Sequence, residues 1–208
     1  MIEIAVRLMP SARCHHSSRK LQWLAPCLVA LLAFCAWPQI ALATVTIGEP
    51  LPPVTIDEGG RIILEEDDDY TIEPWSWSGA GNGRVQVLQY VPGTRKGGDL
   101  YDPLTDRMQR ELDIRRYDII ALVNLDVSSG FIKPFVRSAV VDEQKVFTRA
   151  TMVLDEEGVG QAVWALTEQA AFVVMDPDGS VVDAILGAPT EDDIERILDV
   201  LRDLMPTN

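Results

Sequence analysis

The sequence is poor in the residues that most often carry chemistry in proteins. It holds three cysteines and two histidines, and all five lie within the first 43 of its 208 residues. The stretch from Thr44 to Asn208 therefore forms no disulfide and offers no thiolate nucleophile or imidazole base. It also has no ligands for a soft or borderline metal such as zinc. Thiol redox chemistry and histidine-dependent catalysis are excluded for that stretch.

Positive charge is scarce as well. Of 18 basic and 32 acidic residues, 14 basic and 31 acidic ones follow residue 43, which gives that stretch a net charge of −17. A protein that binds duplex nucleic acid needs a basic face to neutralise phosphates, and no helix-turn-helix pattern is evident, so we expect no nucleic-acid partner. Carboxylates are abundant, but no pair stands out by its spacing. A carboxylate-based or calcium-dependent enzyme is therefore kept only as an alternative.

The first 43 residues have the composition of a secretory signal peptide. They carry four basic residues against one acid, an apolar block over Leu21–Phe34, and a small-residue A-x-A sequence that ends at Ala43. This combination is typical of export signals, and the apolar block is short for a membrane span. We predict cleavage after Ala43, export, and a single mature domain over residues 44–208 without a membrane span. A start at Met9, an uncleaved anchor and a lipoprotein at Cys35 stay open as alternatives.

Two short β-prone runs open the mature part. Val54–Ile56 and Arg61–Leu64 flank Asp57-Glu-Gly-Gly60, and this pattern predicts a hairpin that turns at those four residues. The acidic run Glu65–Asp69 lacks the ligand spacing of a calcium loop. We therefore interpret that run as a solvated turn.

From residue 84 onward, strand and helix patterns alternate. Near-continuous apolar runs predict strands over 85–91, 117–125, 151–154, 171–175 and 181–186. Caps and amphipathic spacing predict helices that begin at Asp102 (as the N-cap, with Pro103 at the first helical position) and at Thr190, a helix over 134–147 and a weak one over 158–166. Right-handed crossovers make the first two long strands parallel and adjacent. The order predicts a three-layer α/β/α fold around a mixed central sheet, with the N-terminal β-hairpin as an extension.

Several motifs together resemble a known family. IGEPLPP precedes the predicted hairpin; VQVLQYVPG, LVNLD and PFVRSAV follow in that order; and TMVLDEEGVGQAVWALTEQAAFVVMDPDGSVV forms the second half. Over Val45–Leu204 this combination resembles the YtfJ family of exported, periplasmic thioredoxin-like proteins. The resemblance implies a thioredoxin-like fold and a periplasmic location. The family has no established molecular function and no agreed catalytic residues, and its label as transcriptional regulators conflicts with an acidic, exported chain.

The chain departs from the wider thioredoxin-like superfamily at its redox residues. The redox cysteines would fall in the loop Pro92–Gly98, which reads PGTRKGG here. The cis-proline that faces them would lie at about Gln169 and is absent. Both losses together predict that disulfide exchange and peroxidase chemistry are absent from the mature chain.

Polar side chains remain where the first two long strands end. Ligands of open α/β sheets bind outside the carboxyl ends of the strands, and loop cations beside a helix N-terminus suit an anion or an acidic peptide. A solubility role on a mobile loop is the alternative for those cations. For Arg137 the alternative is an ion pair with Glu143 or Asp142 on its own helix, or a position along the helix surface. The candidate ligand-binding residues are Gln89, Tyr90, Thr94, Arg95, Lys96, Asn124, Asp126 and Arg137, with no catalytic residue, metal ligand or cofactor assigned.

The sequence thus predicts a redox-inactive, thioredoxin-like periplasmic protein. We expect it to bind a peptide, a protein partner or a small ligand in the cell envelope. An envelope enzyme without thiol chemistry is the first alternative. The second is a structural partner of an envelope complex that uses its acidic surface for steering.

Overall fold

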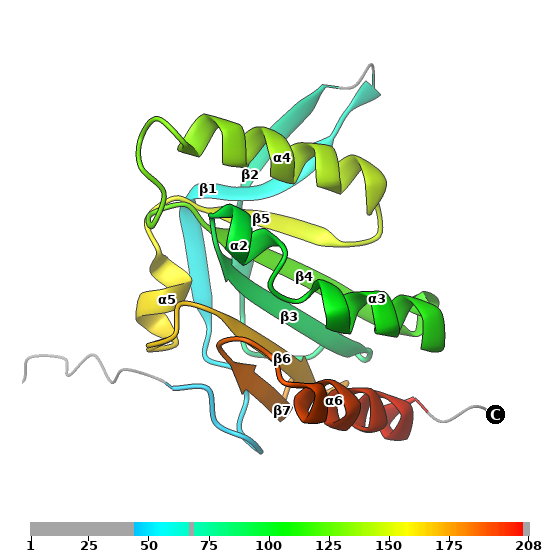
Figure 1. Ribbon diagram of the computed structural model, residues 1–208. Coiled ribbons are helices and arrows are strands. Elements are labelled where there is room, and N and C mark those ends of the chain that lie inside the picture. Colours follow the sequence, from blue (N-terminus) through cyan, green and yellow to red (C-terminus); the bar gives the residue numbers. More distant parts are fainter. Residues whose placement is uncertain (1–43, 67–68, 206–208) are drawn as a thin grey trace, which may run out of the picture. The chain divides into compact units, whose positions relative to one another are not determined.

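The computed structural model describes residues 44–66 and 69–205, so the predicted signal segment and its possible start at Met9 lie outside the described residues. Figure 1 shows a seven-stranded sheet with the order β2-β1-β5-β4-β3-β6-β7. The strands are β1 (Val54–Leu64), β2 (Tyr70–Trp77), β3 (Val85–Pro92), β4 (Tyr117–Asn124), β5 (Thr151–Asp155), β6 (Ala171–Met175) and β7 (Val181–Leu186). The helices are α2 (Arg95–Gly98), α3 (Asp102–Glu111), α4 (Lys133–Val146), α5 (Val159–Val163) and α6 (Glu191–Leu204), with a 3-10 turn η3 at Ile114–Arg116.

The sheet is mixed, as the sequence predicts. Strand β4 lies between β3 and β5 and is parallel to both. Strands β1 and β6 join this parallel centre antiparallel, and β2 and β7 form the two edges. Because β3, β4 and β5 are parallel, their carboxyl ends meet at one edge of the sheet, and the residues that follow them lie together there.

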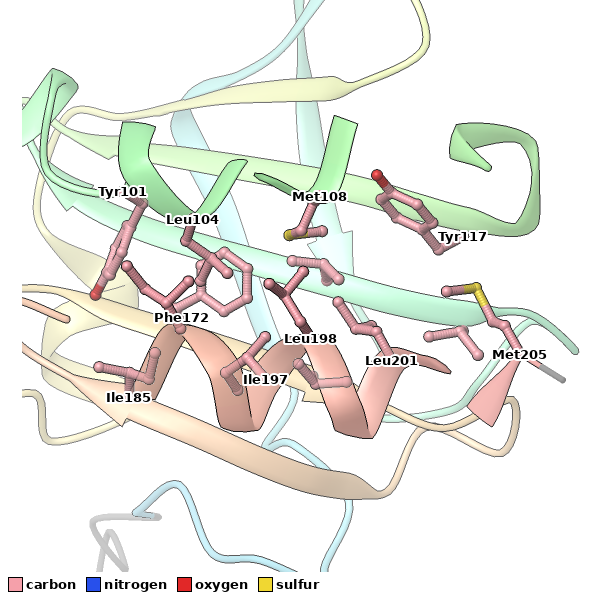
Figure 2. Close-up of a cluster of buried hydrophobic side chains, with 14 of the residues drawn as sticks. Tyr101, Leu104, Met108, Tyr117, Phe172, Ile185, Ile197, Leu198, Leu201 and Met205 are labelled. Carbon is pink, nitrogen blue, oxygen red and sulfur yellow. The ribbon is translucent and has the colours of Figure 1, made fainter. Parts of the chain in front are cut away.

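Helices α3, α4 and α6 cover one face of the sheet. Side chains of α3 and α6 such as Leu104 and Ile197 pack with Val87 and Phe172 in one cluster, part of which Figure 2 shows. Helix α4 packs through Val140 and Val141 on Met152 and Leu154 of β5 in a second cluster. Burial of such apolar surface is the main force that holds the helices on the sheet.

The opposite face has a thinner cover. Its core joins Leu88 and Tyr90 of β3 to Trp164 beside the five-residue α5 and to Leu51 of the N-terminal segment. The indole of Trp164 donates a hydrogen bond of 2.9 Å to the carbonyl of Pro52. The N-terminal segment thus takes the place of a second long helix, and the expected three layers are unequal in thickness.

The predicted turn of the N-terminal hairpin was wrong. Val54–Leu64 is one continuous strand, and the chain reverses after it, where the amide of Glu65 bonds the carbonyl of Asp69 at 2.9 Å. Gly60 has φ +117°, and a Cβ there would lie 2.0 Å from the carbonyl oxygen of Glu73. The glycines therefore serve the close passage of β1 between β2 and β5, where the register shifts. Turn propensity in the sequence was overridden by pairing on both sides.

Two helix starts also differ from the prediction. Helix α3 begins at Asp102 itself, and its N-cap is Tyr101, whose side chain does not cap the helix. Helix α4 begins at Lys133, one residue early. The predicted capping box at Thr190 is confirmed: its hydroxyl accepts from the amide of Asp193 at 3.2 Å, and its own amide donates to the carboxylate of Asp193 at 3.0 Å.

Candidate functional site

The loops after β3 and β4 are tied together by hydrogen bonds at the carboxyl edge. The amide of Gly93 donates to the carbonyl of Asn124 at 2.7 Å, and the hydroxyl of Ser128 donates to the carbonyl of Gly93. The amide of Leu125 donates to the carbonyl of Asp155 at 2.8 Å. The ends of β3, β4 and β5 are thus fixed relative to one another, as a preformed site requires.

A buried carboxylate lies at the end of β5. Asp155 is 0% exposed, and it accepts hydrogen bonds from the hydroxyl of Tyr90 at 2.8 Å and from the amides of Val159 and Gly160 at 2.9 Å each. Burial, together with the charge of Asp155, raises the pKa of Tyr90 well above its usual range. The phenol therefore stays protonated and remains a donor. Three donors satisfy the buried charge without any ligand.

The amide of Asn124 extends this network. Asn124 is 0% exposed; its nitrogen donates to Gln161 at 2.8 Å, and its oxygen accepts from the backbone amide of Asp126 at 2.9 Å. Asp126 itself is exposed. The structure therefore places Tyr90 and Asn124 in a closed polar network that anchors α5, whereas Asp126 is accessible at the surface above it. Neither Asp155 nor Gln161 was among the candidates, although Asp155 is the only acid in a five-residue apolar strand.

The loop that was predicted to hold Thr94, Arg95 and Lys96 forms a short helix. Thr94 is the N-cap of α2, and its hydroxyl accepts from the amide of Gly97 at 3.0 Å. Threonine at an N-cap has this structural role in many helices. Arg95 and Lys96 are exposed, and among the described residues neither takes part in an ion pair.

Arg137 lies apart from the other candidates. Its guanidinium pairs with Glu156, and the ammonium of Lys133 lies 3.6 Å from the same carboxylate. Arg137 lines a shallow, open depression together with Glu58 and Glu157. The expected alternative, an ion pair with Glu143 or Asp142 on its own helix, is wrong, because the arginine reaches across to the residue after β5.

Exposed apolar side chains lie next to the edge and were missed from the sequence. Phe131 is 90% exposed, Ile132 49% and Phe135 75%, at the end of the β4–α4 connection and in the first turn of α4. The sequence GFIKPF carries the signal, since it places three large apolar residues around a helix start. Arg95 and Lys96 belong to α2, which follows the Gly93 loop bonded to Ser128 of the β4–α4 connection, and together with the three apolar residues they form what we call the rim.

Gln89 lies on the other side of β3 from Tyr90. Successive side chains of a strand point to opposite faces, and Gln89 contributes to a groove of about 430 Å³ between α3 and α4. This α3–α4 groove was also missed. Its lining includes Asp102, Glu143 and Tyr117, which are far apart in the sequence.

No metal centre or membrane-spanning helix is found within residues 44–66 and 69–205. No group of three or more acidic side chains there is placed to hold a metal ion, and no helix there is both long and apolar enough to cross a bilayer. No cis peptide bond occurs in this part either, and Gln169 has φ +58°.

The mixed sheet, with its parallel centre and the helices on it, defines an α/β domain of thioredoxin-like fold. The end of β3 and the short helix α2 have the sequence PGTRKGG. The chain belongs to the family described as "Bacterial protein of unknown function (YtfJ_HI0045)", whose model matches residues 45–204.

Two proteins with similar sequences are described as uncharacterized. The uncharacterized protein YtfJ of Escherichia coli (strain K12) is 29% identical over 160 residues, which cover 76% of this chain and 86% of that protein. An uncharacterized protein of Haemophilus influenzae is 22% identical over 158 residues, covering 75% and 85%. These relatives support the family and assign no activity.

Solved structures with a similar fold include proteins named for thiol chemistry. A thioredoxin domain of a thiol-disulfide oxidoreductase from Bacteroides vulgatus matches with a TM-score of 0.46 and 13% identity, covering 76% of this chain and 97% of that one. A thiol-disulfide isomerase from Corynebacterium glutamicum matches with a TM-score of 0.47 and 16% identity, covering 61% and 84%. At this distance their activities are not transferred to this chain.

Proposed function

We propose that the mature protein is a periplasmic binding module that works without thiol chemistry. Its rim takes a peptide segment of an envelope protein that carries acidic and apolar side chains. The observation that carries the proposal is the combination of two cations without an ion pair, Arg95 and Lys96 of α2, with the exposed apolar residues Phe131, Ile132 and Phe135 around the start of α4.

The composition of the rim fits a recognition surface. Large apolar side chains that stand exposed together are unusual on a soluble domain, and aromatic residues and arginine are enriched where proteins bind partners. The bonds between Gly93 and the loop of Asn124 and Ser128 hold the two loops together, so little ordering is needed on binding.

Charge supports an acidic partner segment. The mature stretch carries a net charge of −17, and at least half of its 14 cations, such as Arg107 and Arg196, have ion pairs among the described residues. Arg95 and Lys96 are two adjacent exposed cations without an ion pair among the described residues, and they lie near the apolar side chains of the rim. They would attract carboxylates from a partner and orient it on the phenylalanines.

The absence of thiol chemistry rests on the residues. No cysteine follows position 43, and at the carboxyl edge Asp155 and Tyr90 satisfy each other. We therefore expect no insulin reduction and no peroxide consumption by purified protein. Turnover in either assay above that of a heat-denatured sample would contradict this part of the proposal.

Site-specific photo-crosslinking in living cells tests the binding surface. With the full chain expressed, a crosslinking amino acid replaces Phe131, and in a matched control it replaces the exposed Arg110 of α3. We expect adducts with an envelope protein from position 131 and none from position 110. The double variant R95A/K96A should reduce the adduct severalfold, whereas R61A/R110A, which removes two exposed cations elsewhere, should leave it unchanged.

Three results would contradict the proposed rim. They are adducts at both crosslinking positions, equal sensitivity to the two double variants, or adducts whose yield does not fall as salt is raised. A partner captured in this way should also carry acidic and apolar residues in the crosslinked peptide, as mass spectrometry of the adduct would show.

A further inference from the structure

The α3–α4 groove has a chemistry unlike that of the rim. Its floor is formed by the apolar residues Ile119 and Ala121 of β4 and Met152 of β5, with the polar Gln89 of β3 beside them. Its volume of about 430 Å³ lies within the range of small-molecule sites, which is roughly 300–1,000 Å³. The groove has room for a compact organic ligand.

One end of the groove is negative. Asp102 and Asp106 line it from α3, and Glu143 lines it from the last turn of α4. Burial and the charges of Asp99 and Asp106 raise the pKa of Asp102, while burial and the charges of Asp102 and Asp99 raise that of Glu143. Neighbouring carboxylates contribute to both shifts, and the C-terminal end of a helix, where Glu143 lies, also disfavours an anion. A ligand cation would relieve both effects.

A buried hydroxyl at the other end has no partner. Tyr117 lines the groove and is 2% exposed, and its hydroxyl makes no hydrogen bond with the described residues. Figure 2 shows Tyr117 beyond Met108, with its oxygen pointing away from Leu201 and Met205 of α6. Burial, together with the charge of Asp113, raises its pKa to about 12, so the phenol is a donor that lacks an acceptor. Such a group is costly unless something bonds it.

The two ends are separated by most of the length of α3. Asp102 and Gln109 both line the groove, and seven residues of helix span on the order of 10 Å. Arg149 lines the groove as well, which disfavours a second positive group on the ligand. The groove therefore offers carboxylates, an apolar middle and a hydroxyl donor in that order.

We propose that the α3–α4 groove binds a small organic monocation, in which an apolar body joins an ammonium or guanidinium group to an oxygen acceptor. The cation meets Asp102 and Glu143, the body lies on the apolar floor, and the acceptor takes the hydrogen of Tyr117. The groove and the rim share no residue, and the ligand proposed for the groove is a cation, whereas the rim is proposed to bind acidic segments. The proposal for the groove does not depend on the proposed peptide binding.

Three probes of similar shape test the proposal by calorimetric titration at low salt, with protein purified after expression of the full chain. Tyramine carries both polar groups, phenethylamine lacks the oxygen, and 3-(4-hydroxyphenyl)propionate has a carboxylate in place of the ammonium. We expect tyramine to bind about fivefold more tightly than phenethylamine, in line with one hydrogen bond, and the propionate not to bind.

Matched variants locate the site. E143Q should weaken both amines about tenfold, as expected for the loss of a charged partner, whereas D142N, one residue away and outside the groove, should have no effect. Y117F should remove the preference for tyramine over phenethylamine. A melting curve shows that each variant is folded, and the three-probe comparison on the unaltered protein does not depend on any variant.

The proposal is overturned if neither amine binds saturably, if the propionate binds as well as the amines, or if E143Q and D142N behave alike. A preference for tyramine that survives Y117F would overturn the role given to the hydroxyl, and with it the orientation of the ligand.

Discussion

Replacing Tyr90 by phenylalanine, and Tyr117 by phenylalanine in parallel, tests how the two faces of the sheet differ. Each change removes one oxygen from a buried ring of which 0% or 2% is exposed. The hydroxyl of Tyr90 donates to the buried carboxylate of Asp155 at 2.8 Å, whereas that of Tyr117 has no partner among the described residues. The same chemical deletion should therefore have opposite consequences.

The expected magnitudes follow from these contacts. A hydrogen bond to a charged group contributes roughly 1.5–3 kcal/mol, and Asp155 keeps the amides of Val159 and Gly160 after Y90F, so we expect a loss of about 2 kcal/mol. For a domain of this size that corresponds to a fall in Tm of about 4–8 °C. Y117F breaks no hydrogen bond and removes an unsatisfied buried group, so its stability should be unchanged or higher by up to about 1 kcal/mol.

Urea denaturation followed by tryptophan fluorescence measures both variants, provided that the m-values agree with the unaltered protein. A double-mutant cycle of Y90F with D155N should show coupling of about 1 kcal/mol or more, since the two groups bond each other. Equal losses of stability in Y90F and Y117F, or additive effects in the cycle, would refute this reasoning. They would show that the hydroxyl of Tyr90 is not held by Asp155, or that the hydroxyl of Tyr117 is not unpaired.

Further predictions concern stability. Burial and neighbouring carboxylates raise the pKa of Glu143, so its ionisation opposes folding above the ordinary Glu pKa; E143Q should raise Tm at pH 7, and the gain should vanish below about pH 4, where both states are protonated. G97A places a Cβ 1.9 Å from the carbonyl oxygen of Pro92 and should lower the free energy of unfolding by about 3 kcal/mol. In G98A, in the same helix, the added Cβ meets nothing within 4 Å, so thermal melting should show unchanged stability. T190A removes the N-cap of α6 and should cost about 1 kcal/mol by urea titration; no loss would contradict the capping box.

Elements whose signal is local were predictable. The strand at 171–175, the strand at 181–186 and the Thr190 capping box have the predicted bounds, because apolar runs and cap chemistry act within a few residues. The predicted position of the hairpin turn was wrong because the backbone at Gly59 and Gly60 is set by pairing of β1 with β2 and β5, which lie further along the sequence. Glycine marks a special backbone, and only the tertiary neighbours decide whether it is a turn or a close passage.

The position of the candidate site could be predicted from the sequence, whereas the contacts between its side chains could be predicted only in part. The carboxyl edge of the parallel strands does bring Tyr90, Asn124 and Asp126 together, as topology requires. The sequence gives no sign that Asp155 would satisfy Tyr90, since that pair is 65 residues apart. The α3–α4 groove could not be predicted from the sequence either, because Asp102, Tyr117 and Glu143 line one groove only when α3 and α4 pack on the same face.

Gln89 and Tyr90 show how the two faces of the sheet differ. They are adjacent in β3, yet Tyr90 points into a polar network that needs no ligand, and Gln89 points into a groove that holds unmatched carboxylates and an unmatched hydroxyl. Tyr90 and Asp155 satisfy each other beside the carboxyl edge, whereas the hydroxyl of Tyr117 on the other face has no partner among the described residues. Binding energy in a preformed site comes from groups that the protein leaves unpaired. Under the two proposals, a peptide binds at the exposed rim, and a small ligand binds in the groove, where it can pair with groups that the protein leaves unpaired.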